Sequence, residues 1–149
     1  MGLSELVAVL QLSIGPVIVI SGVGLVLLSM TNRYGRVIDR SRILSATIQQ
    51  ADGMDEQKLQ RQLAVLMQRA RLLRLAIALA SLSLLLAAFL IIALFLVALL
   101  QLHAVALIIV LFTSCMVCLI AGLVVFLVDI NVSLAALKLE VEFRTRTEA

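Results

Sequence analysis

The stretch TNRYGRVIDRSR, residues 31–42, marks the point where an apolar run ends and a basic segment begins. Residues 6–32 carry no formal charge, and four arginines then follow within residues 33–42. About 20 consecutive apolar residues are enough to cross a bilayer, and Lys and Arg are enriched on the cytoplasmic side of such spans. The stretch therefore predicts the cytoplasmic end of a first membrane-spanning helix over residues 6–30.

A second apolar run is long enough for two more crossings. Residues 75–128 contain no Asp, Glu, Lys or Arg, and one crossing needs far fewer residues. Gln101 and His103 interrupt the run and predict a turn, so the two spans fall over residues 75–100 and 104–128. Because 63% of the residues are hydrophobic, against about 45–50% in soluble domains, we predict an all-α membrane protein with three transmembrane helices.

The segment between the first two spans, residues 31–74, is predicted to form a cytosolic antiparallel helical hairpin. Its apolar residues recur at steps of three and four on both sides of a turn predicted around Gly53, and this spacing places them on one helix face. Two such faces pack against each other as in a short coiled coil. These seam residues are Val37, Ser41, Leu44 and Ile48 before the turn, and Leu59, Leu63, Leu66, Ala70 and Leu73 after it.

The tail after the third span continues the same spacing. Ile130, Leu134, Leu137 and Val141 recur at steps of four, three and four, which again indicates one helix face. A cytosolic helix is therefore predicted over residues 129–144. We expect it to leave the membrane without a break and to dock on the hairpin, so that the whole chain is a single membrane domain.

The distribution of charge predicts the topology. Residues 31–74 contain nine Lys or Arg and four Asp or Glu, an excess of five positive charges, and such segments resist translocation. The N-terminus and the turn between the last two spans carry no Lys or Arg. The N-terminus is therefore predicted outside, with the hairpin and the C-terminus in the cytoplasm. Nucleic acid is not an expected partner, because the basic segment lacks aromatic platforms and adjoins apolar spans on both sides.

The arginines of the boundary stretch are the first candidate site. Arg33, Arg36 and Arg40 recur at steps of three and four and so share one helix face. Arg42 and, at the entrance to the second span, Arg74 complete a basic set that is expected at the membrane interface. Such a set either anchors the helices at the interface or binds lipid head groups or another anionic ligand. Anionic membrane lipids are therefore expected partners.

One acidic residue is placed to pair with this basic set. Asp129 follows the third span directly, and it is predicted at the same interface as Arg33 and Arg74. A carboxylate at that depth is partly desolvated, and an arginine partner offsets much of the cost. We therefore predict an ion pair of Asp129 with Arg33 or with Arg74.

Small and polar residues form a stripe on the first span. Gln11, Gly15, Gly22 and Ser29 are spaced by four, seven and seven residues, and the arginine face continues the stripe. In a helix otherwise built mostly from Leu, Ile and Val, such a face should contact protein or water, so it either packs against a helix or lines a pore. Small residues also share a face in the other spans: Ala76, Ala80, Ser83 and Ala87 in the second, and Ser114, Cys118 and Gly122 in the third.

No catalytic or metal-binding set stands out in the sequence. Cys115 and Cys118 are spaced as CxxC, but one such pair inside an apolar run is weak evidence for a metal site. We interpret both as small packing residues. The single histidine, His103, has no partner at ligand spacing. Because no nucleophile and base, phosphate-binding loop or carboxylate pair is present, the chain is expected not to be an enzyme and to need no cofactor or metal.

Several of these stretches together resemble one known family. They are GPVIVISGVG at residues 15–24, TNRYGRVIDRSR at residues 31–42, MQRARLLRLAI at residues 67–77, and the acid Asp129 after the third span. In these features, and over nearly its whole length, the chain is similar to the small bacterial integral membrane proteins of Domain of Unknown Function 2721. The resemblance implies the architecture only, and no activity comes with it. Since the family is bacterial, we expect the chain to lie in the bacterial inner membrane.

Two functions are compatible with this sequence. In the first, the protein is a non-catalytic helical membrane protein that self-associates or serves as an accessory subunit of a larger membrane complex, through its small-residue faces. In the second, it is a homo-oligomeric ion channel or pore, lined by the first helix and favouring anions because rings of arginine set its selectivity. The oligomeric state separates them, because one helix per subunit lines a pore only in a ring of several copies.

Overall fold

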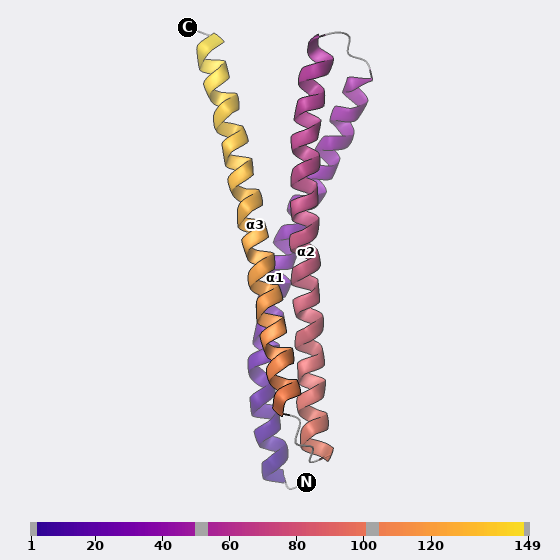
Figure 1. Ribbon diagram of the computed structural model, residues 1–149, viewed down its shortest axis with the longest axis vertical. Coiled ribbons are helices and arrows are strands. Elements are labelled where there is room, and N and C mark those ends of the chain that lie inside the picture. The colour runs from indigo at the N-terminus through magenta and orange to yellow at the C-terminus, as the bar shows by residue number, and fades with distance from the viewer. Residues whose placement is uncertain (1–2, 50–53, 101–104, 148–149) are drawn as a thin grey trace. The chain divides into compact units, whose positions relative to one another are not determined.

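Three long α-helices make up the described part of the chain. The computed structural model describes residues 3–49, 54–100 and 105–147 and gives α1 at Leu3–Ile48, α2 at Met54–Leu100 and α3 at Val105–Thr147 (Figure 1). Each helix contains a segment long and apolar enough to cross a membrane, namely Ile14–Ile48, Leu59–Leu100 and Val105–Ser133. The prediction of an all-helical chain with three such helices is therefore confirmed.

The helices continue across the boundaries where the apolar runs end. α1 extends beyond residue 30 and α3 extends beyond residue 129 without interruption, because the helical spacing of apolar residues persists on both sides of each boundary. The predicted continuation of the third span as a helix is thereby confirmed. The turns predicted at Gly53 and at Gln101 and His103 lie outside the described residues.

The chain divides into two compact units. One comprises Met1–Ser29 and Ile77–Gly122, and the other comprises Met30–Ala76 and Leu123–Ala149. Apart from Glu5, the first of these contains no Asp, Glu, Lys or Arg, whereas the second contains all the arginines of the boundary stretch and Asp129. We therefore call them the apolar unit and the charged unit.

Small residues bring α2 and α3 together in the apolar unit. Ser83 Oγ donates a hydrogen bond to the Cys115 carbonyl at 3.0 Å, and Cys115 Sγ donates to the Ser83 carbonyl at 3.3 Å. Both side chains are buried, as are Ala80 and Ala87 on the same face of α2. The predicted small-residue face of α2 is thus confirmed, and it allows the close backbone approach that is typical of membrane helix pairs.

On α3 the predicted small-residue face is confirmed at Gly122 and differs at the other positions. Cys115 and Gly122 are buried, whereas Ser114 and Cys118 are only half-buried. Cys115 and Gly122 are seven residues apart and therefore share one face. The two hydrogen bonds to Ser83 place Cys115 at the centre of this face, so Cys115 is a packing residue, as we interpreted it from the sequence.

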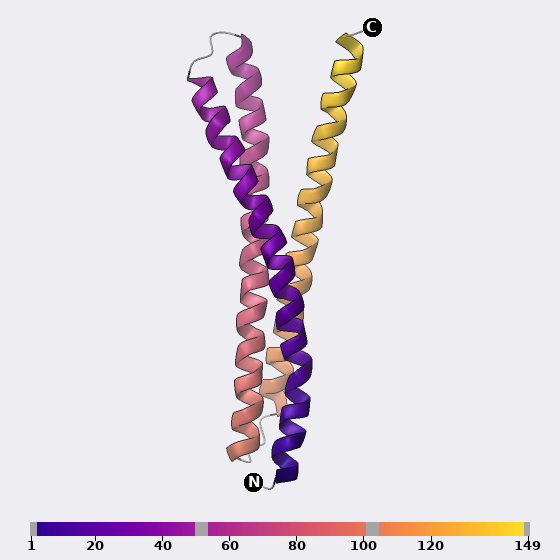
Figure 2. The ribbon, with the colours of Figure 1, turned by 180° about the vertical axis from the view of Figure 1, so that it is seen from behind.

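A buried apolar cluster joins α1 and α2 in the charged unit. It consists of Val37 from α1 with Leu66, Ala70 and Leu73 from α2, and Phe126 from α3 packs against it. All nine predicted seam residues are buried or half-buried, as their steps of three and four require. Figures 1 and 2 show these parts of α1 and α2 side by side.

The last part of α3 continues the third span as one helix through Thr147. Among the described side chains of α3 in the charged unit, Phe126 packs against the apolar cluster and Asp129 pairs with Arg69. Docking of the tail beyond Ser133 on the hairpin stays a prediction.

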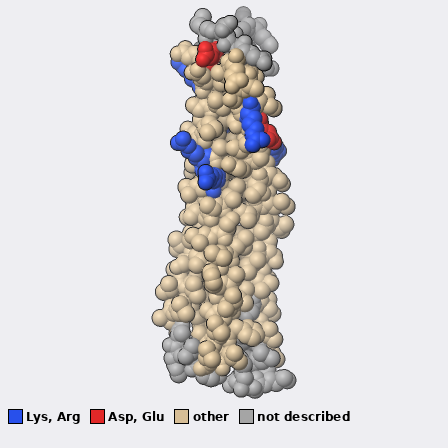
Figure 3. Space-filling model, turned by 90° about the vertical axis from the view of Figure 1, so that its right-hand side faces the viewer, with Lys and Arg blue, Asp and Glu red and all other residues tan. Residues whose placement is uncertain are grey.

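The surface of the described chain is largely apolar away from the charged unit. Large hydrophobic side chains are exposed on every helix, for example Leu25 on α1, Ile92 on α2 and Val110 on α3. On the face drawn in Figure 3, the Lys, Arg, Asp and Glu side chains gather toward one end. An apolar surface this extensive is costly in water and suits contact with lipid.

Candidate functional site

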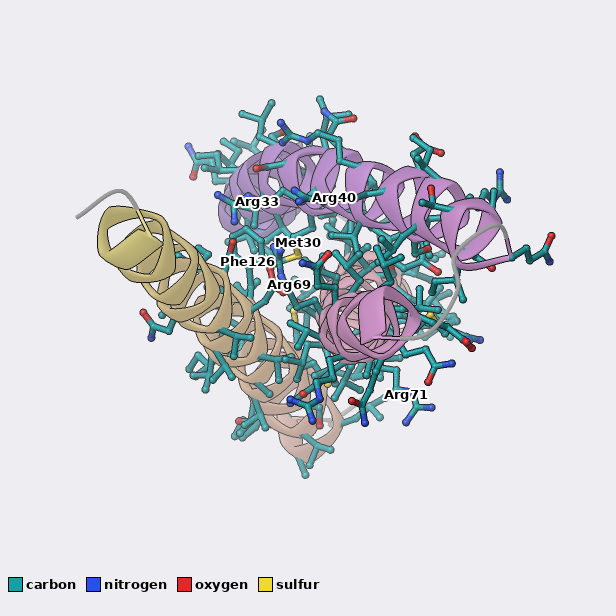
Figure 4. The ribbon with its side chains drawn as sticks, turned by 90° about the horizontal axis from the view of Figure 1, so that it is seen from above. Met30, Arg33, Arg40, Arg69, Arg71 and Phe126 are labelled. Carbon is teal, nitrogen blue, oxygen red and sulfur yellow. The ribbon has the colours of Figure 1, made fainter. Side chains whose placement is uncertain are left out.

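Arginine side chains from two helices converge on one pocket in the charged unit. The pocket has a volume of about 270 Å³ and is lined by Arg33, Arg36, Val37 and Arg40 from α1, Leu66 and Arg69 from α2, and Ser133 from α3. We call it the arginine pocket. Figure 4 shows Arg33, Arg40 and Arg69 turned toward the space between the three helices, whereas Arg71 lies on the outer side of α2.

Helix spacing explains why these side chains meet. Arg33, Arg36 and Arg40 share one face of α1 at steps of three and four, and the structure confirms this because all three line the pocket. Arg69 lies three residues after Leu66 and four before Leu73, so it belongs to the buried face of α2. The packing of α2 against α1 therefore places Arg69 close to the arginines of α1.

A buried carboxylate holds Arg69. Its Nε donates to Oδ1 of Asp129 at 3.3 Å, and the side chain of Arg69 is 18% exposed while that of Asp129 is 0% exposed. Within the described residues, Oδ2 of Asp129 has no hydrogen-bond partner. Charge-assisted N–H···O bonds are usually about 2.7–2.9 Å long. The fully buried carboxylate of Asp129 therefore has one hydrogen bond within the described residues, and that bond is longer than usual.

The partner of Asp129 differs from the prediction. The structure pairs Asp129 with Arg69, not with Arg33 or Arg74. Arg74 follows Arg69 by five residues, which turns it by about 140° around the helix axis, and it is exposed. Arg33 instead lies over the ring of Phe126, with Cζ 5.5 Å from the ring centroid. Since Phe126 precedes Asp129 by three residues, Arg33 reaches the same face of α3 one turn earlier.

Two of the five arginines predicted at the interface lie outside the pocket. Arg42 and Arg74 are exposed and do not line it; Arg42, two residues past Arg40, points about 200° around the helix from it. The prediction missed Arg69 and Ser133. The seam spacing could have identified Arg69, since it falls between Leu66 and Leu73. Ser133 could not have been found this way, because its place depends on how α3 crosses the other helices.

The arginine pocket carries an excess of positive charge. Among the described side chains, no Asp or Glu lines it, and Asp129 is the one carboxylate paired with any of its four arginines. Guanidinium groups stay protonated in proteins. Three positive charges therefore line one small space with no carboxylate partner among the described residues, an arrangement suited to binding an anion.

The stripe on α1 lies in the apolar unit and faces outward. Gln11, Gly15, Gly22 and Ser29 are all exposed. A Cβ atom built at Gly15 or Gly22 meets no atom within 4 Å. The stripe is therefore not a contact face between α1 and the other described helices of this unit.

Comparison with known proteins assigns this architecture to a family. Residues 13–139 match the family described as Protein of unknown function (DUF2721). The chain belongs to this family. No curated protein and no solved structure matches it. The stretches at residues 15–24, 31–42 and 67–77 lie within the matched region, so the resemblance to DUF2721 is confirmed. Since the DUF2721 description gives no activity, function has to be argued from the geometry.

Proposed function

We propose that this DUF2721 protein is a non-catalytic membrane protein that self-associates through the stripe on α1. The observation that carries the proposal is the exposure of Gln11, Gly15, Gly22 and Ser29 in the uncharged, mostly apolar segment 6–30 of α1. Placing the side-chain amide of Gln11 in hydrocarbon costs free energy unless the amide is hydrogen-bonded. A glycine also offers less apolar surface for contact with lipid than a leucine does. A second copy of the chain supplies the neighbour that this face lacks.

The pairing of α2 with α3 supports this proposal. In that pair the small residues Ala80, Ser83 and Cys115 are buried, in keeping with the general rule that small residues let membrane helices approach closely. α1 carries a comparable face that is exposed in the described chain. When this face packs against the same face of a second copy, one symmetric interface buries both faces, as in most homo-oligomers.

The proposal includes the orientation predicted from the sequence. The excess of Lys and Arg in residues 31–74 favours a charged unit in the cytoplasm and an N-terminus outside the bacterial inner membrane. The buried cluster of Val37, Leu66, Ala70 and Leu73 supports a cytosolic hairpin of α1 and α2. An accessory place in a larger membrane complex is compatible with the same surfaces.

A pore lined by α1 is the second candidate. The same exposed stripe favours it, because small and polar side chains are able to face water as well as protein. The two functions differ in what a larger side chain does to the stripe. It disrupts a packed interface, whereas in a pore it narrows the path and leaves the interface in place.

The decisive experiment replaces Gly22 in the stripe by leucine. In a packed interface, Gly22→Leu inserts a side chain between closely approaching backbones, and such overpacking costs about 1–3 kcal/mol. We expect the protein to shift to smaller species when its mass is measured by light scattering after size exclusion in mild detergent. We also expect a lower melting temperature.

Gly24→Leu is the matched control. Gly24 lies two residues along α1, about 200° around the helix from Gly22, and a Cβ atom built there also meets nothing within 4 Å. Gly24 is half-buried whereas Gly22 is exposed, so the control places the same side chain off the stripe, with room for its Cβ atom. Unchanged oligomers of Gly22→Leu combined with loss of ion flux in liposomes favour the pore, and equal effects of both variants contradict any role of the stripe.

A further inference from the structure

We propose that the arginine pocket binds a phosphate group, carried either by a lipid head group or by a soluble phosphate. The pocket lies within the charged unit and shares no residue with the stripe on α1. The proposal therefore goes beyond self-association and does not depend on it.

The charge balance of the pocket favours an anion. Asp129 pairs with Arg69, and Arg33, Arg36 and Arg40 line the same space of about 270 Å³. Like charges three and four residues apart on a helix repel each other and destabilise it. An anion between them turns this repulsion into attraction, so its binding stabilises the charged unit.

The size and the donors of the pocket suit a phosphate group. Its volume of about 270 Å³ lies just below the range of about 300–1,000 Å³ that is typical of sites for drug-sized ligands, so it has room for a phosphate group. Guanidinium binds phosphate through two parallel N–H···O bonds. Phosphate oxygens point in several directions, which matches arginines arriving from both α1 and α2. The hydroxyl of Ser133 adds a donor from α3.

Asp129 acts as a positioning residue for Arg69. The carboxylate accepts from Nε and leaves the two terminal amino groups of the guanidinium available to a ligand. Because the Arg69 side chain is only 18% exposed, its interaction with an anion is less screened than that of a surface arginine. The contact therefore holds one of the four donors in place before the ligand arrives.

The test compares a pocket variant with a matched surface variant in the purified full-length protein. Arg40→Gln removes one lining charge from an exposed position, so the fold is retained. Arg71→Gln removes one exposed arginine from the outer side of α2 (Figure 4) and gives the same net charge. Thermal unfolding in detergent is followed while inorganic phosphate is titrated against chloride at equal ionic strength.

We expect phosphate to raise the melting temperature of the parent protein and of Arg71→Gln alike, because a ligand that binds the native state stabilises it. Arg40→Gln should weaken the apparent affinity by about tenfold or more, as expected for the loss of a hydrogen-bonded charge pair. Arg40→Gln should leave the oligomeric mass unchanged, which separates this proposal from self-association through the stripe.

A second arm distinguishes the two sources of phosphate. The same three proteins are mixed with phosphatidic acid or phosphatidylcholine, and the bound lipid is measured by native mass spectrometry. Phosphatidic acid retained by the parent and by Arg71→Gln but lost from Arg40→Gln, with no effect of inorganic phosphate, assigns the site to a lipid head group. An effect of inorganic phosphate alone assigns it to a soluble phosphate, and both effects together mean that the two compete for one site.

Two outcomes overturn the proposal. If Arg40→Gln and Arg71→Gln lose the same affinity for both probes, binding reflects net charge and not the pocket. If neither inorganic phosphate nor phosphatidic acid binds the parent protein, the pocket does not take a phosphate group.

Discussion

At the scale of single residues, the stability of the charged unit depends strongly on Asp129. Its carboxylate is fully buried, and Arg69 holds it through a contact of 3.3 Å. Removing one partner of a buried ion pair is costly because the other charge stays behind without compensation. The geometry thus makes Asp129 more sensitive to substitution than any exposed acid on the same helices.

The substitution Asp129→Asn should lower the melting temperature in detergent. The amide keeps the shape of the side chain but removes its charge, so Arg69 remains half-buried without a counter-charge. Losing one partner of a fully buried pair costs about 3–5 kcal/mol, and the partial exposure of Arg69 reduces this to about 1–3 kcal/mol. Differential scanning fluorimetry with a thiol-independent dye measures the shift.

Asp39→Asn serves as the comparison for this variant. Asp39 lies on α1, is exposed, and its charge is screened by solvent. The free energy of unfolding of Asp39→Asn should therefore stay within about 0.5 kcal/mol of the parent value, with little change in melting temperature. If Asp129→Asn is as well tolerated as Asp39→Asn, the contact between Asp129 and Arg69 contributes nothing to the fold.

The sequence predicted an arginine partner for Asp129 but named the wrong arginine. Charges near a membrane boundary indicate that a carboxylate will pair with an arginine. They do not specify which of several arginines lies close enough to Asp129. Arg69 was identifiable from its place between Leu66 and Leu73 on the seam, because an arginine on a buried face needs a carboxylate or an anion. Ser133 was not identifiable, because no local pattern specifies where two helices cross.

At the scale of elements, the packing of α1 against α2 in the charged unit follows the spacing of the seam. Leu73 is fully buried in this cluster, whereas Leu75, two residues later, is 50% exposed. The helix turns by about 200° between them. One helix therefore provides a buried leucine and an exposed leucine for direct comparison.

Leu73→Ala should destabilise the protein by about 2–5 kcal/mol, because it removes buried methyl groups and leaves a cavity. Leu75→Ala should change the free energy of unfolding by less than about 1 kcal/mol, since that side chain contacts few neighbours. Unfolding in a denaturing detergent, followed by circular dichroism, compares the two. Similar losses for both variants contradict the cluster at Val37, Leu66, Ala70 and Leu73.

Helices and their buried faces could be predicted from the sequence, whereas the crossing of helices could not. The seam residues of α1 and α2 and the small face of α2 all follow from steps of three and four. On α3, Gly122 was placed correctly on the buried face but Cys115 was missed, because Ser114, Cys115 and Cys118 are all small and periodicity alone does not rank them. The hydrogen bonds between Ser83 and Cys115 show that Cys115 lies on the face of α3 that contacts α2.

At the scale of the whole molecule, the charge distribution predicts one orientation in the membrane. A cysteine introduced as Ser4→Cys should react with a membrane-impermeant maleimide added outside intact cells. A cysteine introduced as Gln57→Cys, at an exposed position of α2, should react only after the membrane is permeabilised. The physical reason is that the basic residues of the 31–74 segment resist translocation.

The parent protein is the control for this labelling. Its own cysteines, Cys115 and Cys118, are buried and half-buried in α3, and thiols in apolar surroundings react poorly, so the parent should give only background signal. If Gln57→Cys is labelled in intact cells and Ser4→Cys is protected, the predicted topology is wrong and the charged unit lies outside.

The contact between Arg69 and Asp129 joins residues 60 positions apart in the sequence, and this has a consequence for biogenesis. The ribosome makes the four arginines of the pocket long before it makes Asp129, so in the nascent chain Arg69 has no Asp129 to pair with. The pocket is complete only when α3 has been made as far as Ser133, which lines it. A chain arrested or truncated before Asp129 therefore carries Arg69 without this carboxylate, and its charged unit should be less stable than that of the whole chain.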